Sequence, residues 1–88
     1  MMNITKEQLI STITYWYEKE FANCERSLKT NDRAQANWID HYIKECLGVA
    51  FFVQELDLPF DEINPIYENI RERFEKLRED FLNDRLTS

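Results

Sequence analysis

The chain contains a single glycine and two prolines among its 88 residues. β-Sandwiches and β-barrels need a turn residue about every 8–12 positions, and this composition does not supply them. Residues that favour helix, such as Glu, Lys, Leu and Ile, are abundant instead. The sequence therefore predicts an all-α fold, and its length predicts one helical domain spanning residues 1–88.

A first helix is predicted over about residues 5–30. Thr5 and Gln8 have the spacing of a capping box, in which each side chain bonds the backbone N–H of the other residue. Apolar residues then recur every three or four positions, which is the pattern of one helix face. This stripe consists of Leu9, Ile10, Ile13, Trp16, Tyr17, Phe21, Cys24 and Leu28.

A second helix is predicted over about residues 32–57, capped by Asn31 or Asp32. Its apolar residues cover more than half of the circumference, so it must be covered on two sides and is expected to be the central element. The short apolar run at 49–53 could by itself form a buried strand, but the flanking residues continue the helical period. The apolar positions are Trp38, Ile39, Tyr42, Ile43, Cys46, Leu47, Val49, Ala50, Phe51, Phe52, Val53 and Leu56.

A third helix is predicted over about residues 61–85, after the break at Pro59. It could begin near Asp61, or at Asn64-Pro65, where Asn would cap and Pro would take the first helical position. The simplest assembly is an antiparallel three-helix up-down-up bundle with the second helix between or across the other two. The apolar seam of the third helix consists of Ile63, Tyr67, Ile70, Phe74, Leu77 and Phe81.

The second helix has more apolar surface than two neighbouring helices can cover. We expect Leu47 and Phe51 to form part of the surplus, which usually marks an interface. A two-fold homodimer is the commonest way to cover such a strip, and a different protein partner is the alternative. Tyr15 points away from the apolar stripe of its own helix and is a further interface candidate.

Two polar residues lie close to the predicted core. A hairpin about residue 31 would place Glu20 level with His41 and Tyr42, so we expect Glu20 to bond one of them. His41 and Glu45 are four positions apart, which is half of a metal site, but Trp38 and Lys44 occupy the positions where a further helical ligand would lie. We therefore expect His41 to pack at the border of the apolar arc, with no metal and no cofactor.

The two cysteines fall on core-facing stripes. The same hairpin would separate Cys24 and Cys46 by about 12 Å of helical rise, which exceeds the roughly 7 Å limit on the Cα separation of a disulfide. We interpret both as small buried apolar side chains without a reactive thiol.

The charge balance is acidic, with 17 Asp and Glu against 11 Lys and Arg. A formal net charge of −6 disfavours direct binding to nucleic-acid phosphates and to anionic membranes. The N-terminus lacks the basic and apolar layout of a signal peptide, and the longest apolar run, 47–53, is far shorter than the roughly 18 residues of a membrane span. We expect a cytoplasmic protein.

No arrangement of residues indicates catalysis, because a single histidine and one glycine leave little from which to build the usual motifs. The leading hypothesis is a non-enzymatic protein-binding module: a small regulator, adaptor or inhibitor. One alternative is an acidic mimic of nucleic acid that inhibits a basic partner. Another is a small metal- or nucleotide-dependent helical enzyme.

Overall fold

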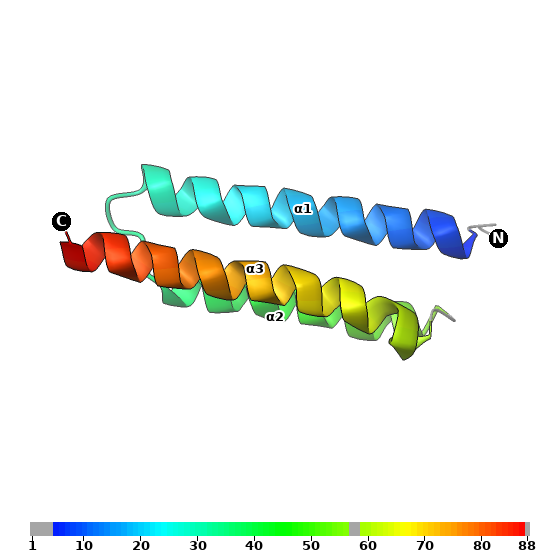
Figure 1. Cartoon of the computed structure of the whole chain (residues 1–88). Helices are drawn as coiled ribbons and strands as arrows, with labels where there is room; N and C mark the ends of the chain where they lie inside the picture. Colours follow the sequence, from blue (N-terminus) through cyan, green and yellow to red (C-terminus); the bar gives the residue numbers. More distant parts are fainter. Residues whose placement is uncertain (1–4, 57–58, 88) are drawn as a thin grey trace.

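The structure is a computed structural model that describes residues 5–56 and 59–87, with side chains as far as Asp84. Within these residues it consists of three helices and no strand: α1 (Lys6–Thr30), α2 (Asn37–Gln54) and α3 (Phe60–Thr87) (Figure 1). The predicted all-α fold is confirmed. The alternative of a strand at 49–53 is excluded, because these residues belong to α2.

The three helices lie side by side along an elongated molecule of 52 × 21 × 16 Å (Figure 1). Each helix packs against both of the others. Ion pairs connect Lys6 to Glu62 between the first turns of α1 and α3, and Glu18 to Arg73 further along both helices. Near the start of α2, Asp40 pairs with Arg78 of α3, which also holds Glu75 at 2.7 Å. The side chains of α3 therefore bind both neighbouring helices.

The start of α1 is fixed by the predicted capping box. The Thr5 hydroxyl oxygen accepts a 3.1 Å hydrogen bond from the Gln8 amide, and the Thr5 amide donates a 2.9 Å bond to Gln8 Oε1. Both backbone donors would otherwise be left without a partner at the helix end. This local prediction is confirmed.

The start of α2 differs from the prediction. The helix begins at Asn37, and its N-cap, Ala36, offers no side-chain hydrogen bond. Asn31 instead closes a turn, since its Oδ1 accepts from the Arg33 amide at 2.9 Å and its carbonyl accepts from the Ala34 amide at 3.0 Å. Ala34 is buried, so the connection itself packs against the core. The expected cap at Asn31 or Asp32 is therefore wrong.

The end of α2 and the start of α3 differ by a few residues from the predicted ones. α2 ends at Gln54, with Glu55 as its C-cap, and the expected end at position 57 lies outside the described residues. α3 begins at Phe60, directly after Pro59, which agrees with the predicted start near Asp61. The alternative start at Asn64-Pro65 is wrong, because Pro65 lies inside α3. A proline there removes one helical donor near the N-terminus.

The core is formed where the three apolar stripes meet. Phe74 is fully buried at its centre, with ring centroids 5.2 Å from Phe21 and 6.2 Å from Tyr42. The buried side chains confirm the predicted stripes of α1 and α3 and the inward part of the wider apolar arc predicted for α2. They are Ile13, Tyr17, Cys24 and Leu28 of α1, Ile39, Cys46, Ala50 and Val53 of α2, and Ile63, Tyr67, Ile70 and Phe74 of α3.

Candidate interaction surface

The outward side of α2 carries a regular line of exposed residues. Cys46 and Ala50 are buried on the side that faces the core. At 100° per residue, a position two residues after Cys46 lies on the opposite side of the helix. Gly48 occupies that position. Three other exposed residues, spaced by three or four positions as on one side of a helix, lie along the same side, and we call these four residues the outer line of α2. The outer line consists of Lys44, Gly48, Phe51 and Glu55.

Large apolar side chains are exposed on this side of α2 and just after it. Phe51 is 56% exposed and Phe52, next to the outer line, is 63% exposed. Leu56 and Phe60, on either side of the connection to α3, are each 51% exposed. Exposed apolar side chains that follow one another in this way mark a binding surface more often than a solvated one. We refer to the outer line together with Phe52 as the α2 surface.

The interface residues predicted from the sequence have different positions in the structure. Phe51 is exposed, as expected, and so is Tyr15, at 70%. Tyr15 lies on α1, on the side opposite the buried Ile13 and Tyr17, and so belongs to a different helix from the α2 surface. Leu47 is half-buried and packs against the core, so only part of its side chain is available at the exposed side of α2.

Sequence reasoning missed three of the most exposed apolar residues: Phe52, Leu56 and Phe60. The apolar pattern alone groups the first two with the covered arc of the second helix. Phe52 and Leu56 follow Gly48 at intervals of four residues, so the position of the one glycine in the chain could have identified the uncovered side.

Gly48 leaves a notch in the outer line. A Cβ atom built on Gly48 would meet no heavy atom within 4 Å. The charged residues at the two ends of the line, Lys44 and Glu55, are exposed, and within residues 5–56 and 59–87 the structure records no ion pair for either. The α2 surface therefore combines an open notch, two exposed aromatic rings and two unpaired charges of opposite sign.

In the part of the chain that the structure describes, no hydrogen bond or ion pair joins Glu20 to His41 or Tyr42, so the expected bond does not form. Glu20 is half-buried and lies near the carboxylate of Glu45 instead, and burial followed by the charge of Glu45 raises the pKa of Glu20 above its ordinary value. His41 Nε2 lies 3.5 Å from Glu45 Oε1, and its side chain is 76% exposed. His41 therefore does not pack at the core border, and Tyr42 stacks on Phe74.

Both cysteines are fully buried free thiols, as the apolar stripes predicted. Burial raises the pKa of Cys24 to about 11 and that of Cys46 to about 12. The thiols are therefore protonated at neutral pH, and the nucleophilic thiolate is suppressed. Their role in the structure is to fill space in the core.

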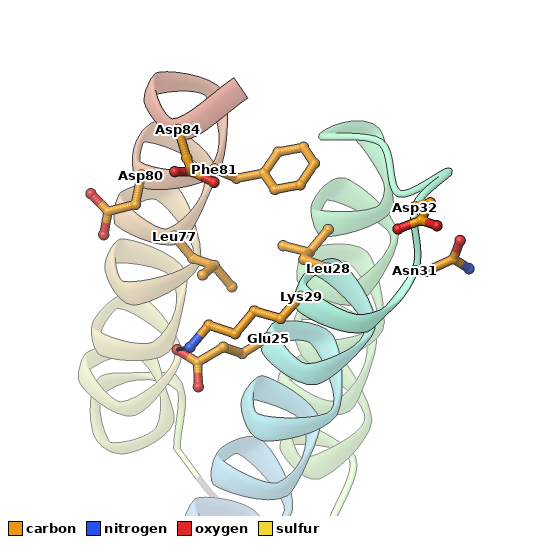
Figure 2. A pocket seen from close by; sticks show the side chains of 9 residues that line it. All are labelled: Glu25, Leu28, Lys29, Asn31, Asp32, Leu77, Asp80, Phe81 and Asp84. Carbon is orange, nitrogen blue, oxygen red and sulfur yellow. Dashed lines mark ion pairs between the residues drawn. The ribbon is translucent and has the colours of Figure 1, made fainter. Parts of the chain in front are cut away.

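A hollow of about 570 Å³ lies between the end of α1 and the last turns of α3. Leu28 of α1 and Leu77 and Phe81 of α3 point toward one another across it (Figure 2). Lys29 lies 3.8 Å from Glu25 at its edge, so the one cation of the lining already has an anionic neighbour. The full lining is Glu25, Leu28, Lys29, Asn31, Asp32, Leu77, Asp80, Phe81 and Asp84.

The polar groups do not converge in the way that metal chemistry requires. In the part of the chain that the structure describes, no three His, Cys, Asp or Glu side chains are grouped so as to hold a metal ion. Over the same residues, no helix is both long enough and apolar enough to cross a bilayer.

No family model matches the chain, and searches of curated proteins and of solved structures find no match.

Proposed function

We propose that this chain is a non-enzymatic protein-binding module, which acts as a small regulator, adaptor or inhibitor through the α2 surface. The observation that carries the proposal is the exposure of two neighbouring phenylalanines, Phe51 at 56% and Phe52 at 63%, on the outward side of α2. Aromatic residues that project from a surface are over-represented among the residues that dominate binding energy.

We further propose that the helices form the up-down-up bundle expected from the sequence. The pairing of Lys6 with Glu62 and of Glu18 with Arg73 supports this arrangement, because the partners advance together along α1 and α3. α2 then runs in the opposite direction between its two connections (Figure 1). In such a bundle each helix keeps one side toward solvent, and the exposed side of α2 is the one that carries the apolar residues.

The acidic exterior supports protein binding better than mimicry of nucleic acid. A mimic needs carboxylates gathered on one face. On α3, however, Glu68 lies 2.8 Å from Arg71 and Glu75 lies 2.7 Å from Arg78, so the negative charges alternate with positive ones. We therefore favour a partner recognised by apolar contact, with the acidic surface keeping the chain in solution.

The experiment that tests the proposal compares the wild type with the variant F51Q/F52Q. Glutamine favours helix and both positions are exposed, so the variant is expected to fold. We expect the wild type to show binding in one of two ways. It associates with itself in sedimentation measurements, or it retains a protein from a lysate of its source cells, and that protein, once purified, binds the purified chain directly. The variant should lose that binding.

The matched control is Y15Q, which removes an exposed ring from α1 and should retain the binding. Two results would overturn the proposal. The first is a wild type that binds neither itself nor any protein at micromolar concentration. The second is binding that F51Q/F52Q leaves unchanged.

A further inference from the structure

We propose that the partner of the α2 surface is a second copy of this chain, bound so that the two α2 helices run antiparallel and touch along their outer lines. This inference rests on the proposed function and specifies its partner. The argument depends on the order of four exposed residues along one helix: Lys44, Gly48, Phe51 and Glu55.

The outer line has the symmetry that a two-fold interface requires. In such an interface the same patch of both copies is used, so it must be complementary to itself when its direction is reversed. Along the sequence, the midpoint of Lys44 and Glu55 falls between positions 49 and 50. The midpoint of Gly48 and Phe51 falls at the same place. A two-fold axis through that point therefore places Lys44 opposite Glu55 of the second copy, and Gly48 opposite its Phe51.

The charges at the two ends of the outer line are complementary in this arrangement. Lys44 and Glu55 are separated by about 16 Å along α2, at 1.5 Å per residue, so they do not pair within one helix. Reversal of the second copy brings each against the opposite charge, twice by symmetry. A parallel arrangement would instead place Lys44 against Lys44 and Glu55 against Glu55, which like-charge repulsion disfavours.

The centre of the outer line is complementary in shape. Gly48 has no side chain, and no heavy atom would lie within 4 Å of a Cβ built there. The ring of Phe51 from the second copy has room to lie over this notch, where the absence of a Cβ lets the two backbones approach closely. Phe52 borders the outer line and, at 63% exposed, adds apolar surface on one flank. A few buried aromatic rings at the centre of an interface supply most of its binding energy.

A second copy explains features that a different partner leaves unrelated. A hetero-partner needs apolar area, but it does not need charges of opposite sign at the two ends of the outer line. Nor does it need the only glycine of the chain at one inner position of the line and an exposed phenylalanine at the other. Self-complementarity accounts for both placements with one axis.

Charge reversal tests the arrangement directly. We expect K44E and E55K each to raise the dissociation constant of self-association about tenfold or more, since each places two pairs of like charges together. An equimolar mixture of the two single variants should associate about as tightly as the wild type. In the mixed pair, the glutamate introduced at position 44 meets the lysine introduced at position 55, and the native Lys44 meets the native Glu55. Sedimentation equilibrium of the full-length chain measures all three samples.

The notch has its own test. G48L introduces a helix-forming residue at an exposed position, so we expect the chain to fold with unchanged or higher thermal stability while self-association weakens about tenfold or more. Circular dichroism melts confirm that each variant is folded. The variant A22L, which adds a leucine at an exposed position of α1, is the matched control and should leave self-association unchanged.

The possible results separate this inference from the proposed function. Self-association that depends on Phe51 and Phe52 but shows no rescue in the mixture would overturn the antiparallel pairing and leave the protein-binding module intact. A strictly monomeric wild type that retains another protein through Phe51 and Phe52 would overturn the second copy as partner. Loss of all binding would overturn both.

Discussion

The hydroxyl of Tyr17 donates a 2.8 Å hydrogen bond to the backbone carbonyl of Cys46, and both residues are buried. The bond joins α1 to α2 across 29 positions of sequence. Burial raises the pKa of Tyr17 well above its ordinary value, which keeps the hydroxyl protonated and able to donate. This contact fixes how far α1 and α2 are shifted along one another, and therefore which residues of the two helices meet.

We predict that Y17F lowers the free energy of unfolding by about 0.5–1.5 kcal/mol, the usual net contribution of one hydrogen bond. The ring still fills its place in the core, so only the bond is removed. Urea unfolding followed by circular dichroism measures the difference. The control is Y15F, at a position 70% exposed, which should change nothing. Equal stabilities of Y17F and Y15F would contradict the assignment.

Truncation of the core ring Phe74 should be far more costly. Phe74 is fully buried beside Phe21 and Tyr42, so F74A leaves a cavity and is predicted to cost about 3–5 kcal/mol. Because a chain of this size has little stability to lose, we expect a large drop in melting temperature. F52A removes the same ring at a position 63% exposed and should cost about 0.5 kcal/mol or less. Similar losses for F74A and F52A would contradict this packing of the core.

The pair Glu20–Glu45 predicts a specific pH dependence. A raised carboxyl pKa means that the folded chain holds this proton more tightly than the unfolded chain does, so the pair stabilises the fold at low pH. That contribution is lost as the pH rises through the raised pKa of Glu20, which lies above 4.5. We therefore expect E20Q to be more stable than the wild type at neutral pH, with the difference shrinking toward acid pH.

Unfolding free energies measured from about pH 4 to pH 7 for both proteins test this prediction. The matched control is E79Q, at an exposed position of α3, which should follow the wild type across the range. A destabilised E20Q at neutral pH would show that the carboxylate of Glu20 is favourable where it lies, which is the opposite of the predicted direction.

The notch at Gly48 predicts a gain of stability that is independent of binding. Because a Cβ at this position meets no heavy atom within 4 Å, G48A adds helix propensity without a clash. We expect the free energy of unfolding to rise by about 0.8–1 kcal/mol, measured at a concentration where the chain is monomeric. The reverse change at an exposed position of α1, A22G, should cost a similar amount. A loss of stability in G48A would mean that the position is not open.

The sequence was a reliable guide wherever a structural feature depends on neighbouring residues. The capping box of Thr5 and Gln8 is local, and so is the three-and-four spacing of the buried stripes; both were predicted correctly. The seam of α3 is another example, since Ile63, Tyr67 and Ile70 are buried at the predicted intervals.

The errors concern features that depend on tertiary contacts. Asn31 could cap a helix or close a turn, and the burial of Ala34 against the core accompanies the turn. The register of α1 and α2 is close to the expected one, since Tyr17 meets Cys46, but the His41 side chain is 76% exposed and Glu20 meets Glu45 instead. Which side of α2 stays uncovered also depends on tertiary packing. The sequence predicted surplus apolar surface on α2, but it did not identify exposed Phe52 as part of that surface.

The most direct test of the central claim, that this chain binds a second copy of itself through the α2 surface, is its amide nuclear magnetic resonance spectrum recorded at increasing protein concentration. We predict shifts or line broadening confined to α2 between Lys44 and Glu55, with Tyr15 on α1 unaffected. Changes that cluster instead around the hollow between α1 and α3, or a spectrum that stays the same from micromolar to millimolar concentration, would contradict the account.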